Sequence, residues 1–320
     1  MVSLRRFDLL VVGEINPDII VSDQDPSPAF GQTERRVASI VMAPGSSSVL
    51  TALAAARLGL RTAFCGLLGD DPFGRFMLAA MEQGGIDTGA CRVVEGAATG
   101  ASVILDRSSD RAILTSTGVM AALRAEDVPL ELVRDSRHLH VGAWYLQPSL
   151  QAGLPGLFTV ARIGGTSTSL DPGGDPADHW SGLGDVLAET DVFLPNQNEA
   201  RRIGGVTDDD QAVSTIAAAG PAGMVVAVKL GERGAMAAEG SHVERASAPK
   251  VATVDAIGAG DAFDAGVLFG RLAGWPLTRS LALAVACGAL STRARGGVDG
   301  QATLAEALAF IDGPGETWSR

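Results

Sequence analysis

The chain has 320 residues, of which 46% are apolar, and it carries a formal net charge of −12. Such a chain can bury a substantial core, as one large α/β domain or as two small ones. The acidic balance argues against nucleic acid or an anionic membrane as the main partner, because both require a basic face. Any anionic ligand must therefore be held by local features.

The chain shows no sign of a membrane segment or a cross-linked framework. No apolar run approaches the ~20 residues that cross a bilayer, and the amino terminus lacks the apolar stretch and cleavage site of a signal peptide. Cys65, Cys91 and Cys287 have neither C-x-x-C spacing nor an even count, which argues against disulfides and structural zinc. We expect a cytoplasmic protein without a membrane partner.

Residues 7–13 form a short apolar run that ends in Gly13, as expected for a buried parallel strand. The pattern G-x-G-x-x-G does not follow this run, which argues against a dinucleotide-dependent dehydrogenase. The segment that follows contains Asn16 and Asp18. Their polar side chains are candidates for binding a small ligand, although Asn-Pro-Asp is also a common turn.

Segments rich in β-branched residues occupy much of 19–42 and 99–116, and the second contains a polar turn at 106–110. They predict short strands, among them Val37–Val41. Between the two segments, residues 45–59 begin with small polar residues, continue as an alanine-rich helix and stop at Gly59.

Residues 191–199 end a predicted strand with the sequence Pro-Asn-Gln-Asn-Glu. Asn196 can cap a helix there, and Glu199 can complete a capping box three residues later. Glu199 also offers an oxygen ligand of the kind that Mg²⁺ prefers. The spacing supports both interpretations, and they are compatible.

Residues 224–235 read as a buried strand that enters a glycine turn at Gly231 and Gly234. Lys229, near the end of this strand, is one of only two lysines and can neutralise a phosphate. Neither lysine lies in G-x-x-x-x-G-K-[ST], which excludes the phosphate loop of P-loop NTPases.

The most informative stretch is 255–261, D-A-I-G-A-G-D, which leads into the apolar run 262–270. Small residues at a helix N-terminus let the backbone approach a ligand, and the free N–H groups suit a phosphate. A carboxylate at Asp261 is awkward beside an anion unless it takes a proton from an attacking hydroxyl. The alternative from these residues alone is that Asp261 is a plain helix N-cap.

D-x-x-G-A-G-D followed by A-F-x-A-G resembles the C-terminal signature of the ribokinase (PfkB) family of carbohydrate kinases. Residues 68–74, L-G-D-D-P-F-G, and the P-N-x-x-E at 195–199 are similar to two other motifs of the family. The resemblance implies a ribokinase-like three-layer α/β/α sandwich with a mostly parallel central sheet and a small β-sheet lid. Residues 1–320 would form one kinase domain, with lid segments at about 16–42 and 99–116. The alternative for these segments is surface hairpins without a role in closure.

The resemblance also implies the reaction and the residues that serve it. The reaction would be ATP-dependent phosphorylation of a hydroxyl on a small sugar or sugar-like polyol, with Asp261 as general base and Gly258, Ala259 and Gly260 as the anion hole. The residues that would bind the sugar are Asn16, Asp18, Gly45, Ser46 and Arg111. Those that would bind ATP are Asn196, Lys229, Gly231 and Gly234. Glu199 would hold Mg²⁺ through water, and K⁺ would bind to Asp255 and, mostly through backbone, to Ile257, Ser291, Ala294 and Gly296.

Three positions depart from the family pattern. Ser46 replaces the second glycine of a Gly-Gly pair, Leu50 replaces an asparagine that contacts sugar hydroxyls, and Gly173 replaces an asparagine. The substrate is therefore open, and a nucleoside or vitamin kinase of the same fold is an alternative. So is a catalytically silent sugar-binding regulator, although it could dispense with Asp261. A homodimer formed through the lid is a further expectation.

Overall fold

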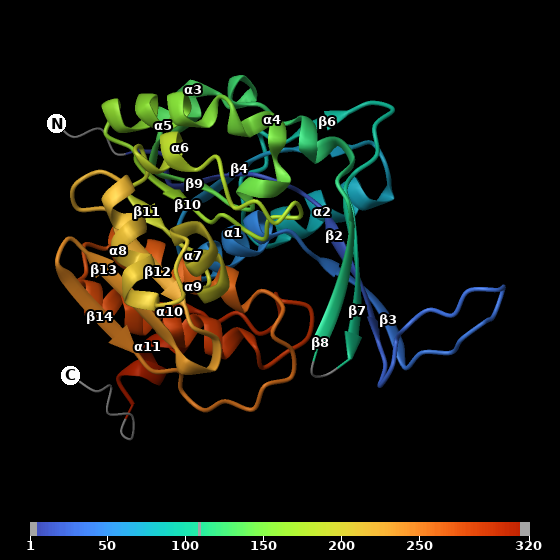
Figure 1. Cartoon of the computed structure of the whole chain (residues 1–320). Helices are drawn as coiled ribbons and strands as arrows, with labels where there is room; N and C mark the ends of the chain where they lie inside the picture. Colours follow the sequence, from blue (N-terminus) through green and yellow to red (C-terminus); the bar gives the residue numbers. More distant parts are fainter. Residues whose placement is uncertain (1–4, 108–109, 314–320) are drawn as a thin grey trace.

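The computed structural model describes residues 5–107 and 110–313 (Figure 1). The expected domain range 1–320 and the expected lid segment 99–116 therefore include positions 1–4, 108–109 and 314–320, which lie outside the described residues. None of the helices in the described part is long and apolar enough to cross a membrane.

Eight strands form the main sheet in the spatial order β14-β13-β12-β11-β10-β9-β1-β4. The strands from β12 to β4 run parallel to their neighbours, and β13 and β14 add an antiparallel edge. In chain order the strands are β1 (Phe7–Val12), β4 (Thr62–Cys65), β9 (Ser136–Val141), β10 (Ser167–Leu170), β11 (Val192–Phe193), β12 (Val225–Lys229), β13 (Ala235–Glu239) and β14 (His242–Ala246). The expected mostly parallel sheet is confirmed.

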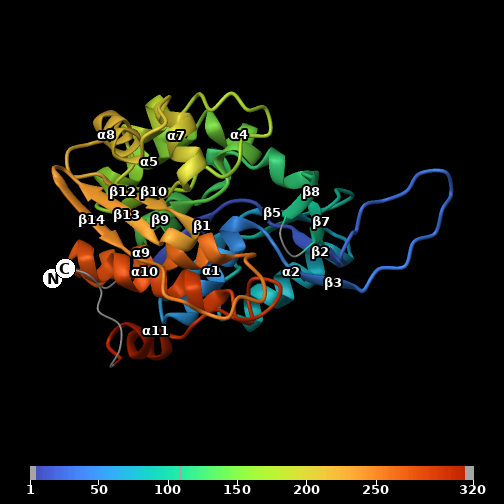
Figure 2. The same cartoon turned by 60° about the horizontal axis from the view of Figure 1, so that its bottom comes forward.

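Helices cover both faces of this sheet, which explains why its strands are apolar on both sides. Leu9 and Val11 of β1 pack in one core, and Leu10 and Val12 pack in the other. The first core contains α1 (Ser47–Arg57), α2 (Pro72–Gln83), α9 (Ala259–Leu272), α10 (Leu277–Ser291) and α11 (Leu304–Ile311). The second contains α3 (Leu130–Arg134), α4 (Pro148–Gln151), α5 (Leu154–Ile163), α6 (Gly184–Leu187), α7 (Gln197–Gly204) and α8 (Asp209–Ala219). Figure 2 shows the main sheet between these two layers, as the three-layer prediction requires.

A small sheet projects from one side of this body (Figure 1). Its order is β3-β2-β7-β8, with β2 and β7 parallel and the outer pairs antiparallel. The bounds are β2 (Pro17–Ser22), β3 (Ser39–Pro44), β7 (Ala101–Arg107) and β8 (Asp110–Ser116). The strand expected at Val37–Val41 is thus shifted toward the carboxyl end, because pairing with β2 selects the register from Ser39 to Pro44. A separate parallel pair joins β5 (Leu67–Gly69) to β6 (Arg92–Val94).

The small sheet contacts the body through a compact apolar cluster. Ile20, Ala43 and Ile104 from the sheet pack with Leu50 of α1 and Ile257. Leu50 is 3% exposed, so its side chain fills this contact. We call this group the Leu50 contact. It places β2 and β7 beside the amino-terminal ends of α1 and α9.

Candidate active site

The turn at 258–260 leads directly into α9. Gly258 is the N-cap of this helix, and its φ of 75° is a left-handed conformation that favours glycine. A Cβ atom on Gly258 would also lie 2.9 Å from the carbonyl oxygen of Gly297. Asp261 is the third residue of the helix and not its cap, so the plain N-cap interpretation is wrong. The N-cap is therefore Gly258, and no side chain caps the N-terminus of this helix within the described residues.

Asp261 lies in the first turn of α9 and contacts the first turn of α1. Its Oδ1 accepts a hydrogen bond from the hydroxyl of Ser47, the first residue of α1. Burial raises the pKa of Asp261 to about 7, although the Ser47 hydroxyl acts in the opposite direction, and the nearby Asp171 raises it further. A carboxylate that titrates near neutrality beside the turn predicted to bind an anion suits a general base.

A buried ion cluster lies beside this turn. Nζ of Lys229 lies 2.7 Å from Oδ2 of Asp171 and 3.0 Å from Oδ2 of Asp264. Oxygen atoms of Asp171, Asp261 and Asp264 lie within 4.8 Å of one another. Burial opposes the charge on Lys229, but the two carboxylates raise its pKa above the usual value. A Cβ atom on Gly260 would lie 3.8 Å from this ammonium group, which therefore lies close to the turn while bonded to two carboxylates.

Asn16 and Asp18 lie where the small sheet meets the body. Both are buried, and Nδ2 of Asn16 lies 3.4 Å from Oδ1 of Asp18. A Cβ atom on Gly45 would lie 2.2 Å from the same Oδ1, so glycine is needed to leave room for this carboxylate. Burial raises the pKa of Asp18 to about 7, against the positive charge of Arg111. Four of the predicted sugar-binding residues thus share one region.

Strand register extends this region across the small sheet. Asp18 pairs with Ser102, which pairs with Thr115, so the three side chains share a face of the sheet. Asn16 donates to Oγ of Ser102 at 3.3 Å, and the hydroxyls of Ser102 and Thr115 are 3.0 Å apart. Arg111 lies on the same face of β8 by strand alternation and is exposed. The sheet therefore turns a polar row toward Asp18.

The fifth predicted sugar ligand, Ser46, has its hydroxyl bonded elsewhere. It donates to the carbonyl oxygen of Glu14 at 2.6 Å, and it accepts the N–H of Val49 at 3.1 Å as the N-cap of α1. Its φ of 71° is uncommon for a residue other than glycine. Ser46 thus keeps the left-handed backbone conformation that suits glycine, and its side chain adds a cap to α1.

Asn196 and Glu199 form the capping box that their spacing predicts. Oδ1 of Asn196 accepts the N–H of Glu199 at 3.0 Å, and Oε2 of Glu199 accepts the N–H of Asn196 at 2.7 Å. Burial raises the pKa of Glu199 to about 7, and the charge of Asp171 adds to this effect. Because a nearby cation would favour the ionised form of this carboxyl group, Glu199 suits a Mg²⁺ ion.

Gly231 and Gly234, in the turn after β12, have φ angles of 61° and 94°. A Cβ atom on Gly234 would lie 2.0 Å from the carbonyl oxygen of Ala246. Packing against β14 therefore explains the need for glycine at position 234, whatever ligand the turn binds.

Asp255 connects the turn before α9 to the loop after α10. Its Oδ1 accepts the N–H of Ile257 and its Oδ2 accepts the N–H of Gly296, each at 2.9 Å. The predicted potassium ligands Ser291 and Ala294 lie at the end of α10 and in the loop that follows it. The structure thus brings together the two segments that would form this cation site.

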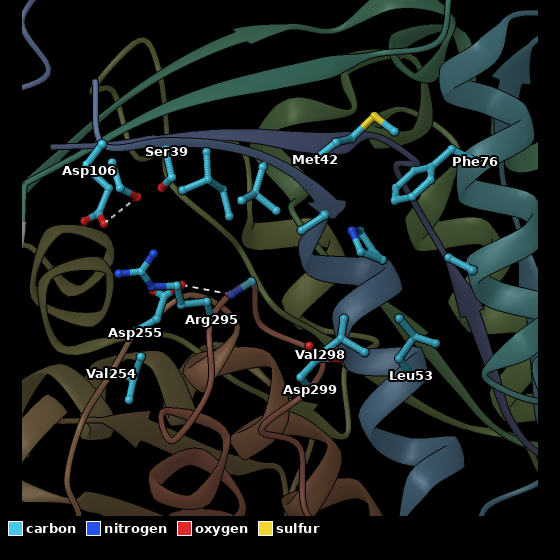
Figure 3. A pocket seen from close by; sticks show the side chains of 18 of the residues that line it. Ser39, Met42, Leu53, Phe76, Asp106, Val254, Asp255, Arg295, Val298 and Asp299 are labelled. Atoms are coloured by element: carbon cyan, nitrogen blue, oxygen red, sulfur yellow. Dashed lines mark hydrogen bonds between the residues drawn. The ribbon is translucent and has the colours of Figure 1, made fainter. Parts of the chain in front are cut away.

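A cavity of about 880 Å³ lies between the small sheet, α1, α2 and this loop (Figure 3). Asp255, Gly296 and Arg295 line it from the loop side. Within the described parts of the chain, neither Asp18 nor Asp261 contributes to its walls. The cavity therefore borders the predicted potassium loop and is distinct from the region around the predicted base.

Sequence reasoning did not single out Glu14, Ser47 or Asp264 as site residues. Asp264 follows Asp261 by one helical turn, so helical spacing could have found it. Glu14 lies two residues after the end of a parallel strand, and ligands bind beyond the carboxyl ends of such strands. The contact of Ser47 with Asp261 joins positions 214 residues apart, and no local pattern signals it.

The fold and the groups gathered beyond the carboxyl ends of the parallel strands fit a kinase with an alcohol group as its acceptor. Comparison with known families narrows this class. The profile of the pfkB family carbohydrate kinases matches residues 6–304. The chain belongs to this family and is a sugar kinase.

Individual relatives agree with this assignment. A fructokinase of Klebsiella pneumoniae is 32% identical over 272 residues, which cover 80% of this chain and 88% of the relative. The structure of Arabidopsis thaliana ribokinase complexed with ribose and ATP has a TM-score of 0.84 at 24% identity, covering 96% of this chain and 99% of that one. An Escherichia coli protein assigned as a ribokinase II, in complex with ATP and Mg²⁺, gives the same values. These structures show the shared fold.

Proposed function

We propose that this sugar kinase transfers the γ-phosphoryl group of ATP to a hydroxyl of a small sugar or sugar-like polyol, with Asp261 as the base. The observation that carries the proposal is the position of Asp261 in the first turn of α9, beside the left-handed Gly258 turn and with a pKa raised to about 7. A base that titrates near the working pH accepts a proton efficiently.

The residues of the chain divide the work. Asp18 and Asn16 hold the acceptor against the polar row of the small sheet, and Arg111 supplies positive charge at its rim. Asp261 receives the proton of the acceptor hydroxyl. The N–H groups of the Gly258, Ala259 and Gly260 turn stabilise charge that develops on the phosphoryl oxygens. Positioning and electrostatic stabilisation thus supply most of the catalysis.

Asn196, Lys229, Gly231 and Gly234 would hold ATP, and Glu199 would hold Mg²⁺ through water. Glu199 fits this role, because it is buried and the charges of Asp171 and Asp261 nearby oppose its ionisation until a cation is present. When bound, Mg²⁺·ATP supplies the phosphoryl group and neutralises charge on it. Lys229 contributes its charge from a fixed place, held by Asp171 and Asp264. The ATP and Mg²⁺ bound to the Escherichia coli relative, and the ATP bound to the Arabidopsis ribokinase, support this assignment.

The Asp255 loop would bind K⁺. The carboxylate of Asp255 accepts the N–H groups of Ile257 and Gly296, and the 880 Å³ cavity adjoins this loop. Ser291 at the end of α10 and Ala294 after it would supply the remaining ligands, mostly through backbone. A cation there would stiffen the turn that carries the anion hole. Assays in potassium against sodium test this role, and equal rates would remove K⁺ from the mechanism.

We assign residues 1–320 to one cytoplasmic kinase domain, in which segments 16–42 and 99–116 form a lid over the acceptor. The outer face of the lid carries Met42, Ile40 and Leu114, which are 44%, 65% and 62% exposed. Such an apolar sheet face favours pairing with the same face of a second copy. Leu114→Lys should convert a dimer into monomers in sedimentation experiments, and an unchanged mass would refute pairing through this face.

A coupled assay of ADP release tests the function as a whole. It should be run with Mg²⁺·ATP over pentoses, hexoses, keto-deoxy acids and nucleosides. We expect turnover with one class of sugar or sugar acid. Preference for nucleosides would indicate the nucleoside-kinase alternative, and sugar binding without ADP release would indicate a silent regulator.

A further inference from the structure

The first turn of α1 carries three consecutive serines, and their hydroxyls contact two carboxyl groups that are distant in sequence. Glu14 lies two residues after the end of β1 and is 1% exposed. Its Oε1 accepts the N–H of Ser48 at 3.1 Å, and its Oε2 accepts the hydroxyl of Ser48. The hydroxyl of Ser46, which donates to the carbonyl oxygen of Glu14, also lies 3.1 Å from Oε1. Burial raises the pKa of Glu14, and the two donors of Ser48 partly offset this effect.

The surroundings of Ser48 are shaped to hold it in this place. A Cβ atom on Gly13 would lie 2.0 Å from Oγ of Ser48, and one on Gly142 would lie 2.7 Å from the same atom. Glycine on two neighbouring segments therefore makes room for this hydroxyl. Glu14 thus fixes both the position and the rotation of the first turn of α1.

Ser47 lies between the two serines that Glu14 holds, and its hydroxyl contacts Oδ1 of Asp261. Because its neighbours are anchored, Ser47 has little freedom to turn away from α9. A hydroxyl donor on Oδ1 stabilises the charged form of the carboxylate and leaves Oδ2 for the acceptor hydroxyl. The contact therefore bears on both the orientation and the proton affinity of Asp261.

We propose that Ser47 is the positioning residue of the base: it orients Asp261 and keeps its carboxylate ionised, and Glu14 holds Ser47 in place for this task. The inference rests on the proposed role of Asp261. Other carboxyl groups face Asp261 from several elements: Glu14 after β1, Asp171 after β10, Glu199 on α7 and Asp264 on α9 itself. Lys229 on β12 provides the opposing positive charge. Against so many acidic neighbours, a neutral donor favours ionisation without binding another charge.

The pH dependence of kcat/KM for the acceptor tests this role, because it reports the ionisation of the free enzyme. Hydrogen bonds to a charged group are strong enough that losing one moves a pKa by about one to two units. In Ser47→Ala the acid limb, the part of the profile where kcat/KM falls at low pH, should move to higher pH by that amount. At high pH the rate should approach that of the wild type. Ser47→Thr should restore the limb, because it keeps the hydroxyl.

Ser48→Ala tests the role of Glu14 in the same helical turn. It removes a donor from Glu14 but keeps the Ser47 hydroxyl, so it should lower Tm and raise the acid limb by less than Ser47→Ala does. A uniform loss of rate in Ser47→Ala at every pH, or a Ser47→Thr variant as impaired as Ser47→Ala, would overturn the proposal.

The failure of this inference can be told apart from the failure of the proposed function. If Asp261→Asn is inactive while Ser47→Ala leaves the acid limb in place, Asp261 is the base and Ser47 does not position it. If Asp261→Asn retains wild-type turnover, the proposed function itself fails.

Discussion

Two regions differ in how firmly their side chains are held: the small sheet, and the carboxyl-terminal edge of the main sheet, where Asp171 follows β10 and Lys229 ends β12. We call the second region the edge. At the edge, the Asp171 and Asp264 side chains are 6% and 0% exposed and share the ammonium group of Lys229. On the small sheet, β8 is exposed along its whole length, and Leu114 is 62% exposed. One region is a preorganised electrostatic network, and the other is a thin sheet joined to the body by the Leu50 contact.

This difference indicates that the groups for phosphoryl transfer and the groups for acceptor selection occupy separate regions of the molecule. Groups that act on developing charge need fixed positions and low dielectric, which the buried edge supplies. Groups that admit and release an acceptor often lie on a lid that opens and closes, and the small sheet is the candidate for this role. We therefore expect changes at the edge to affect stability and kcat, and changes near the small sheet to affect acceptor use.

The largest effect on stability should come from Lys229→Met. It leaves Asp171 and Asp264 buried without their cation, and breaking a buried ion pair from one side costs about 3–5 kcal/mol. Urea unfolding measures this loss. In the double variant Lys229→Met/Asp171→Asn much of it should return, because Lys229 lowers the pKa of Asp171 against the effect of burial, and the second substitution removes this stranded charge. A loss below about 1 kcal/mol in the single variant would show that the edge is not the rigid region we describe.

Asp18→Ala should come next, and it acts where the small sheet meets the body. The variant loses charged hydrogen bonds to the acceptor, which should lower kcat/KM for the sugar by about a hundredfold or more. The KM for ATP should stay within a few-fold of wild type. Unimpaired sugar turnover would refute the role of Asp18.

Ribose provides a related check on acceptor choice. Leu50 packs in the contact between sheet and body and offers no hydrogen bond to an acceptor. We therefore expect the enzyme to prefer another sugar, and efficient ribose turnover by the wild type would contradict this expectation.

The pH dependence of stability should show a smaller effect. Asp18 and Asp261 have a pKa raised to about 7 in the folded protein, whereas an unfolded carboxyl group titrates at about 4. Between these values the folded state binds more protons than the unfolded chain, so their contribution makes stability fall as pH rises through this window. His138 and His140 act in the opposite direction, because burial lowers their pKa to about 3 and about 4, but they are common to the wild type and to Asp261→Asn. Thermal unfolding without ligands should therefore show that the Tm of the wild type falls relative to the Tm of Asp261→Asn between pH 5 and pH 7.5. A Tm difference that does not change with pH would contradict this contribution of Asp261.

Much of this architecture can be predicted from the sequence, because the relevant signals are local. Apolar runs mark the strands of the main sheet, and Asn196 and Glu199 are three residues apart in their capping box. The glycine turn before α9 is likewise encoded by adjacent residues. Where a strand boundary depended on pairing, as with β3, local pattern placed it too early.

The rest of the site depends on contacts between distant segments. The sequence shows a serine in place of glycine at position 46, but not that its hydroxyl serves Glu14. It shows Lys229 as a free positive charge, whereas the fold surrounds it with Asp171 and Asp264. Leu50 likewise looks like an altered sugar ligand, although the fold packs it against the small sheet. Such outcomes follow from tertiary packing, which local periodicity does not encode.

The turnover of Asp261→Asn tests the central claim most directly, because the substitution keeps the shape of the side chain and removes its basicity. With ATP and Mg²⁺ saturating and the acceptor found by the ADP-release assay, kcat should fall by about 10²–10⁴-fold. The Kd for ATP should change little, because the turn at 258–260 is built from backbone. A variant that binds ATP normally and keeps near wild-type kcat would place the base elsewhere and contradict the mechanism.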